Sequence, residues 1–272
     1  MMYEWITENS ESDTRTSYPA CKIWEGSTAV CDSVLIADSD VFGRMLFLDG
    51  ELQSASADEH IYHEALVHPA MSCVGNGSRV LVIGGGEGAT VREVLKWNPV
   101  IVSWVDIDEE LVKLCAEHLG WSNGIFPSNV TLYPEDIRNI LPHLMYYDVI
   151  IMDLPDPDGD TGYLYSDEFM KDLRKHLLPG GIIVTHCGPV RPFGTIGEGF
   201  QRLLPQFGTR GFYSQMIPSF QSEWGFLMWN ETGYLSIGVF TVPYGLRVAD
   251  QHQIALWKSR TKLWNDAIRK CV

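Results

Sequence analysis

Basic residues are scarce in this sequence. The 272 residues include 20 Lys and Arg against 35 Asp and Glu, which leaves a formal net charge of −15 at pH 7. An acidic field repels phosphate backbones and attracts cations. We therefore expect no nucleic acid partner, whereas a polyamine or a sulfonium compound is a suitable ligand if the carboxylates converge.

Long apolar segments are also missing. The longest apolar runs, such as Val149–Met152, have the length of a strand and are far too short to cross a bilayer. The first residues, Met1-Met2-Tyr3-Glu4-Trp5, have no basic flank, and no apolar run follows them, so we expect no cleavable signal peptide. These absences predict a soluble, cytoplasmic protein without a membrane partner.

Metal-ligand and disulfide patterns are absent as well. The six cysteines include no C-x-x-C pair, which is typical of reduced thiols in a cytosolic protein. The eight histidines form no zinc-like set, and His60-x-x-His63-Glu64 is the nearest approach to one. We expect no metal site.

The N-terminal part of the chain has the pattern of a small β structure. Residues 22–53 consist of strand-like runs separated by turns, and Asp49-Gly50 is a hairpin signal. Residues 58–70 then change to helical spacing, and Pro69 limits the end of the expected helix. We expect residues 1–72 to form a β-strand domain with a linking helix.

Strands and helices alternate in the rest of the chain. Apolar runs rich in β-branched residues, separated by amphipathic helices, predict a parallel sheet covered on both faces. Late strands are expected near 212–217, 225–229 and 235–240, and a final helix over 251–269. The predicted fold class is α/β, with residues 73–272 forming a doubly wound, Rossmann-like sheet of the class I methyltransferase type.

A glycine loop follows the first strand of this part. The run Val80–Ile83 leads into Gly84-Gly85-Gly86-Glu87-Gly88, where glycines let the backbone approach a ligand closely. About twenty residues later, Asp106 and Asp108 follow the next strand, at the place where a carboxylate accepts hydrogen bonds from ribose. The combination predicts a nucleoside-containing ligand.

The charge of Glu87 narrows the choice of nucleoside. A dinucleotide needs the helix N-terminus for its pyrophosphate, and Glu87 places a negative charge there. The same charge opposes the carboxylate of S-adenosylmethionine and favours a ligand with an amine in its place. Decarboxylated S-adenosylmethionine fits that description, although a carboxylate in a glycine loop can also turn to solvent.

A second carboxylate group follows the strand 147–152. Strand ends in this fold face the ligand crevice, so Asp153 and Asp156 of Asp153-Leu154-Pro155-Asp156-Pro157 are expected beside the cofactor. A carboxylate can hold a substrate ammonium, accept its proton and stabilise the remaining charge. The turn is also similar to the Asp/Asn-Pro-Pro-Tyr turn of amino-methylating enzymes, so an N-methyltransferase is an alternative. Tyr62-His63-Glu64 adds a polar cluster on the preceding helix.

Together these segments resemble the polyamine aminopropyltransferase (spermidine/spermine synthase) family. The matching segments extend from about residue 28 to 230: Asp49–Ser54, Asp58–Glu64, Leu66–Ala70, Gly84–Gly88, Val105–Asp108, Asp136 and Asp153–Pro157. Within the family, Gln53-Ser54, Asp153-Leu154, Ile217-Pro218-Ser219 and Trp224-Gly225 are similar to the thermospermine synthase pattern.

The resemblance implies a reaction and a set of roles. The aminopropyl group of decarboxylated S-adenosylmethionine, a co-substrate and not a permanent cofactor, is transferred to a polyamine with release of methylthioadenosine. Spermidine is the favoured acceptor, with putrescine or agmatine as alternatives, and Asp153, Asp156, Glu87 and Glu64 are expected to supply carboxylates along a channel for this long polycation. A non-catalytic polyamine-binding protein is the alternative from another class. The implied assembly is a homodimer or homotetramer. The implied site contains the base Asp153, the substrate-binding residues Gln53, Tyr62, His63, Glu87 and Asp156, and the cofactor-binding residues Gly84, Gly85, Gly86, Glu87, Asp106 and Asp136.

Three positions differ from the family pattern. Cys31, or Asp32 after a shift of one residue, stands where relatives usually have Gln on an early strand. His186 replaces the Gln after the Gly-Gly-Ile strand, and Phe220 replaces the Tyr after Ile-Pro-Ser/Thr. These differences concern the identity of the acceptor.

Overall fold

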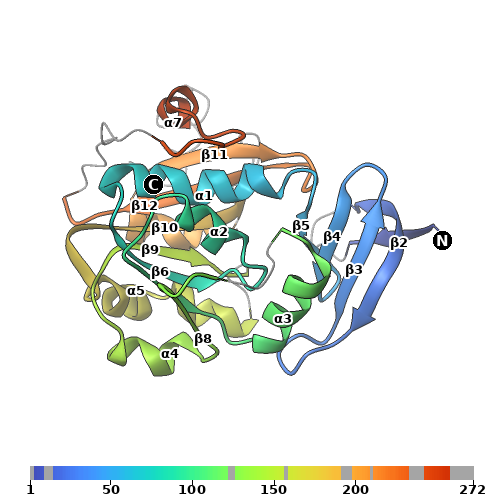
Figure 1. Cartoon of the computed structure of the whole chain (residues 1–272), viewed down its shortest axis with the longest axis horizontal. Coiled ribbons are helices and arrows are strands. Elements are labelled where there is room, and N and C mark those ends of the chain that lie inside the picture. Colours follow the sequence, from blue (N-terminus) through green and yellow to red (C-terminus); the bar gives the residue numbers. More distant parts are fainter. Residues whose placement is uncertain are drawn as a thin grey trace.

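The computed structural model of the protein describes residues 3–8, 15–121, 126–155, 159–190, 198–208, 211–232 and 242–257. In this part of the chain, strands form two sheets (Figure 1): a five-stranded antiparallel sheet in the order β1-β2-β3-β4-β5, and a seven-stranded sheet in the order β11-β12-β10-β9-β6-β7-β8. None of the helices that connect them combines the length and apolar character that a membrane crossing requires within the described residues.

The first sheet is a meander of neighbouring strands. Its strands follow chain order: β1 Glu4–Thr7, β2 Ser17–Gly26, β3 Val34–Ser39, β4 Gly43–Leu48 and β5 Glu51–Ala55. The predicted hairpin signal is confirmed between β4 and β5, because Asp49 (φ 51) and Gly50 (φ 85) both adopt the left-handed conformation that a two-residue hairpin turn needs.

The second sheet has parallel strands in its centre. Its strands are β6 Arg79–Gly84, β7 Ile101–Val105, β8 Val130–Tyr133, β9 Tyr147–Asp153, β10 Leu177–Pro189, β11 Phe212–Ile217 and β12 Ser222–Trp229. The sequence predicted a parallel sheet, and this is wrong for β12, which runs antiparallel to both β10 and β11. The turn Pro218–Gln221 between β11 and β12 is too short for the crossover that a parallel pair requires.

Helices cover both faces of this sheet. They are α1 Glu59–Val74, α2 Ala89–Leu95, α3 Glu109–His118, α4 Ile137–Ile140, α5 Asp167–Arg174, α6 Glu198–Phe207 and α7 Gln251–Trp257, with short 3-10 turns at Leu141–His143 and Gly159–Tyr165. In β6, Val80 and Val82 belong to the core under α1 and α2, whereas Leu81 and Ile83 belong to the core under α5 and α6. This alternation confirms the doubly wound architecture (Figure 1).

Helix α1 continues beyond the proline that was expected to end it. Pro69 has no N–H for the carbonyl of Ala65, four residues earlier, and this carbonyl is buried. The hydroxyl of Tyr213 on β11 donates to that carbonyl at 2.8 Å, so a tertiary contact replaces the missing helical bond. The helix therefore runs to Val74 and crosses residue 72, where the sequence predicted a boundary between two domains. The division of the chain into two domains at that residue remains a prediction.

Helix α3 lies between the two sheets. Leu111 and Cys115 of this helix pack with Val34, Ile36 and Leu46 of the first sheet. The N-terminal sheet is thereby held beside the carboxyl ends of β6 and β7. The predicted strand 235–240 and the part of the final helix after Trp257 lie outside the described residues.

Candidate active site

A large cavity opens where the two sheets meet. Its volume is about 1350 Å³, and it lies at the carboxyl ends of the parallel strands. Gly84–Glu87, Asp106 and Asp153 line it from the second sheet, and Leu46 and Gln53 line it from the first. This is the place where doubly wound sheets bind their ligands.

The glycine loop is shaped by contact with the end of β9. Gly84 (φ 80) and Gly85 (φ 70) have left-handed backbones, and the N–H of Gly85 donates to the carbonyl of Asp153 at 2.8 Å. A Cβ on Gly84 would lie only 2.2 Å from that carbonyl oxygen, and one on Gly86 would lie 3.1 Å from Oδ2 of Asp106. Glycine at these positions therefore keeps the loop closely packed and leaves the carboxylates uncovered.

Two hydroxyl groups hold the carboxylate of Asp153. Tyr62 on α1 donates to Oδ1 at 2.8 Å, and Thr90 on α2 donates to Oδ2 at 2.5 Å. Burial raises the pKa of Tyr62 well above its ordinary value, so the phenol stays protonated and remains a donor. Both donors are neutral, so they orient the carboxylate without cancelling its charge. Thr90 was not predicted, although its place in the first turn after a glycine loop is a usable signal.

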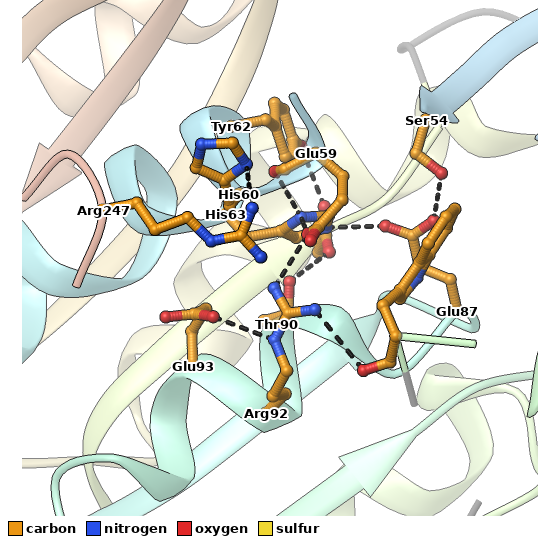
Figure 2. A network of polar contacts seen from close by, with 12 residues as sticks. Ser54, Glu59, His60, Tyr62, His63, Glu87, Thr90, Arg92, Glu93 and Arg247 are labelled. Atoms are coloured by element: carbon orange, nitrogen blue, oxygen red, sulfur yellow. Dashed lines mark hydrogen bonds and ion pairs between the residues drawn. The ribbon is translucent and has the colours of Figure 1, made fainter. Parts of the chain in front are cut away.

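Two side chains, His63 and Ser54, hold the carboxylate of Glu87. Nε2 of His63 lies 2.7 Å from Oε1, and the hydroxyl of Ser54 on β5 donates to Oε2. Nδ1 of His63 in turn lies 2.9 Å from Oε2 of Glu59 (Figure 2). Burial alone lowers the pKa of His63, but Glu87 and Glu59 outweigh it and raise the pKa well above its ordinary value. His63 lies at the cavity wall, but both of its nitrogens face carboxylates.

The two carboxylates predicted after β7, Asp106 and Asp108, have different surroundings. Asp106 is buried beside Gly86, and burial raises its pKa to about 6. Asp108 caps α3 by accepting the N–H of Leu111 at 2.9 Å, and it also accepts the hydroxyl of Thr28 at 2.5 Å. Asp108 is therefore committed to structure, and Asp106 is the carboxylate available to a ligand.

The other predicted residues differ in how they meet the cavity. Asp136 lines it and caps α4, and Arg138 binds the Asp136 carboxylate and lowers its pKa. Gln53 lines the cavity and donates to the carbonyl of Glu51 at 3.3 Å. Asp156 lies outside the described residues.

The structure overturns the expectation for Glu64. It was expected to contribute a carboxylate along a polyamine channel, but its side chain is buried and accepts the backbone N–H groups of residues 247, 248 and 249 at 2.7, 2.7 and 2.8 Å. In the predicted polar cluster, Tyr62 and His63 therefore line the cavity and Glu64 does not, because successive helical residues point about 100° apart. His60 faces Arg247 and does not pair with His63. Within the described residues, no three potential metal ligands lie close enough together to hold a metal ion.

The comparison with known families agrees with this geometry. A model described as the spermine/spermidine synthase domain matches residues 59–236, which is more than half of the chain. The chain belongs to the spermine/spermidine synthase family.

Several curated relatives of this synthase-family chain are similar over most of its length. It is 39% identical to polyamine aminopropyltransferase 2 of Pseudomonas aeruginosa, with 78% of this chain and 64% of that protein covered. It is 39% identical to polyamine aminopropyltransferase 2 of Hyperthermus butylicus (78% and 72% covered) and 34% identical to thermospermine synthase ACAULIS5 of Arabidopsis thaliana (82% and 69% covered). The match thus spans less than two thirds of the Pseudomonas protein.

Solved structures of the family share the fold. A spermidine synthase crystallised with the transition-state analogue AdoDATO superposes with a TM-score of 0.86 at 20% identity, with 98% of this chain and 95% of that chain covered. The spermidine synthase of Thermotoga maritima gives a TM-score of 0.84 at 19% identity, with 98% and 94% covered. At these identities the likeness establishes the architecture, including the N-terminal antiparallel sheet.

The three positions where this synthase-family chain departs from the pattern all lie at the cavity. Cys31 lines it, whereas Asp32 is exposed, and burial raises the pKa of the Cys31 thiol to about 11. The ring of Phe220 lies 4.8 Å from that of Trp224. His186 donates from Nε2 to the carbonyl of Leu154 and accepts from Nε1 of Trp224 at 3.3 Å through Nδ1.

The cavity is also lined by carboxylates that sequence reasoning did not single out. They come from the N-terminal sheet, from the end of β8 and from β12: Glu8, Glu51, Glu135 and Glu223. No local motif marks them, because each is a surface-type residue in its own segment. Only the approach of the two sheets brings them to one cavity, and they make its lining strongly acidic.

Proposed function

We propose that this protein transfers the aminopropyl group of decarboxylated S-adenosylmethionine to an amine of a polyamine and releases methylthioadenosine. The observation that carries the proposal is the pairing of a glycine loop with two carboxylates, Glu87 and Asp153, at the end of the same sheet. Family membership and the names of the curated relatives support it.

The donor is proposed to lie along the glycine loop. Asp106, beside Gly86, accepts the ribose hydroxyls, and Asp136 lies at the wall where the adenine is expected. The amine of the aminopropyl group lies at Glu87. A carboxylate at that point of the ligand would meet Glu87 at close range, and two like charges about 4 Å apart repel by about 1 kcal/mol in water and about 4 kcal/mol near a protein surface. S-adenosylmethionine is therefore disfavoured.

Asp153 is proposed as the base. Tyr62 and Thr90 orient its carboxylate, which holds the acceptor ammonium and takes its proton. The neutral nitrogen attacks the methylene carbon bound to the sulfonium. A C–N bond forms, the C–S bond breaks with its electron pair going to sulfur, and methylthioadenosine leaves as a neutral thioether.

Spermidine is the proposed acceptor, with thermospermine as the product. The cavity is larger than the roughly 300–1,000 Å³ of common ligand pockets, and its lining includes Glu8 and Glu223 in addition to Glu87 and Asp153. These features suit a long linear polycation better than putrescine. The 34% identity to a thermospermine synthase of Arabidopsis thaliana supports the same choice.

The decisive experiment incubates the protein with decarboxylated S-adenosylmethionine and, in parallel, putrescine, agmatine and spermidine. We expect methylthioadenosine with each productive acceptor, fastest with spermidine, and a tetraamine identified as thermospermine by chromatography and mass spectrometry. Faster turnover of putrescine or agmatine would refute the acceptor but retain the reaction class. Formation of S-adenosylhomocysteine from S-adenosylmethionine would favour a methyltransferase, and polyamine binding without turnover would favour a binding protein.

A further inference from the structure

A row of alternating charges runs from the partly exposed Arg92, through buried side chains, to the cavity (Figure 2). Arg92 on α2 lies 2.8 Å from Glu59, Glu59 lies 2.9 Å from Nδ1 of His63, and Nε2 of His63 lies 2.7 Å from Glu87. Ser54 donates to the second oxygen of Glu87. Of the four charged groups, His63 and Glu87 line the cavity, whereas Glu59 and Arg92 lie behind it.

Glu59 has no part in the transfer chemistry, yet it is a buried carboxylate. Its side chain is 2% exposed, and a buried charge is retained only when its partners offset the loss of hydration. Burial alone raises the pKa of Glu59, but hydrogen bonds from His63 and Arg92 outweigh it and lower the pKa to about 2. Glu59 is therefore fully ionised, and its effect on the cavity passes through His63.

The hydrogen positions on His63 follow from its neighbours. Nδ1 faces the carbonyl oxygen of Glu59 at 2.7 Å and Oε2 of the same residue, and both of these oxygens only accept. Nδ1 must therefore carry a hydrogen. With Glu59 ionised, Nε2 also keeps its hydrogen and donates to Glu87, which fixes the direction of that carboxylate.

We propose that Glu59 is a positioning residue for the aminopropyl donor: through His63 it keeps the carboxylate of Glu87 aimed at the amine of the bound donor. This inference rests on the proposed function. Arg92 and His63 are both cationic, and Glu59 separates them. Without the negative charge of Glu59, the imidazolium of His63 loses a proton more easily. The neutral imidazole then turns either a lone pair or an uncharged N–H toward Glu87, and both hold that carboxylate less firmly than the imidazolium does.

The consequence is a change in pH dependence. The groups that face His63 are Glu59 and Tyr62 from α1 and Glu87 from the glycine loop, with Arg92 from α2 reaching it through Glu59. In the wild type these carboxylates keep the imidazole charged throughout the neutral range. In Glu59→Gln, the imidazole is charged at low pH and neutral at high pH, so donor binding weakens as pH rises.

Glu93 provides a matched control. It is as buried as Glu59, lies on the same interface between α1 and α2, and contacts Arg92 at 2.9 Å and a histidine of α1, His68, at 2.9 Å. It does not line the cavity and has no contact with Glu87 among the described interactions. Glu93→Gln therefore repeats the loss of a buried carboxylate without touching the donor site.

The test measures donor KM and kcat between about pH 6.5 and 8.5, where histidine titrates, for the wild type, Glu59→Gln, Glu59→Asp and Glu93→Gln. For Glu59→Gln we expect a donor KM raised about tenfold at the upper end, the equivalent of one charge-assisted hydrogen bond, and less at the lower end, with a smaller change in kcat. Glu59→Asp should recover part of the loss. The wild type and Glu93→Gln should show no such slope.

A second readout does not require turnover. Ring-nitrogen NMR of His63, assigned with His63→Gln, should show a doubly protonated imidazole across this range in the wild type and a titrating one in Glu59→Gln. Identical titration in both proteins, or a donor KM in Glu59→Gln that follows Glu93→Gln, overturns the inference. If the wild type releases no methylthioadenosine but the NMR difference is found, the proposed function fails while the control of His63 by Glu59 stands.

Discussion

Replacing Asp153 by Asn tests the proposed base most directly. The two side chains that donate to its carboxylate, Tyr62 and Thr90, are neutral hydroxyls. Asparagine has the same shape, keeps an oxygen for Tyr62 and offers an amide N–H to the oxygen of Thr90. The backbone carbonyl of residue 153, which accepts the N–H of Gly85 and holds the glycine loop, is unchanged. The variant should therefore fold and bind the donor.

The expected loss lies in the chemical step. Asn cannot accept the proton of the acceptor ammonium, and the loss of a general base lowers rates by about 10²–10⁴-fold, or about 3–5 kcal/mol of transition-state stabilisation. The assay is the release of methylthioadenosine at saturating donor and spermidine, with donor KM measured in parallel. We expect kcat to fall by this factor, with little change in donor KM.

Asp148→Asn is the control for this experiment. Asp148 is on the same strand, β9, but near its opposite end, where its carboxylate accepts the N–H of Arg79 at 2.7 Å outside the cavity. Its rate should equal that of the wild type. If Asp153→Asn retains a rate within a few-fold of the control, Asp153 is not the base and the reasoning is refuted.

Three further predictions concern binding, stability and assembly. Because burial raises the pKa of Asp106 to about 6, its carboxylate is ionised above that pH, so donor KM should increase as pH falls through about 6, and Asp106→Asn should abolish this dependence; a wild-type donor KM that is flat from pH 5 to 8 contradicts the role of Asp106. Tyr213→Phe leaves the buried carbonyl of Ala65 without its donor and should reduce the free energy of unfolding in urea by about 1–3 kcal/mol without altering donor KM; an unchanged unfolding curve would show that the bond does not support α1. The family resemblance predicts a homodimer or homotetramer, which sedimentation at micromolar concentration should detect, and a purely monomeric profile would count against it.

Sequence reasoning reached the parts of the site that depend on local pattern and simple topology. The carboxyl ends of parallel strands meet at one edge of a sheet, so a glycine loop after one strand and Asp153 after another are expected to be neighbours. The structure places Gly85 and Asp153 in direct contact. The pairing of Glu59 with His63 also has a local basis, since residues four apart lie on one face of a helix, although it was not predicted.

Other contacts depend on side-chain direction, which adjacency in sequence does not reveal. His63 and Glu64 are neighbours on α1, but one faces Glu87 and the other binds the backbone of residues 247–249. Pro69 was expected to end the helix, because the hydroxyl of Tyr213 that replaces its lost hydrogen bond comes from a strand 144 residues later. Neither outcome is encoded in the segment concerned.

By itself, the sequence determined the alternation of strands and helices, the glycine loop and the acidic strand ends, because these follow from hydrophobic period, backbone freedom and charge within short segments. The tertiary structure decided which carboxylates face the cavity. Asp106 remains open to a ligand while Asp108 caps a helix, and Glu8 and Glu223 join the lining from segments distant in the chain. The physical reason is that a carboxylate's role depends on which donors the packing of sheets and helices brings within hydrogen-bond distance.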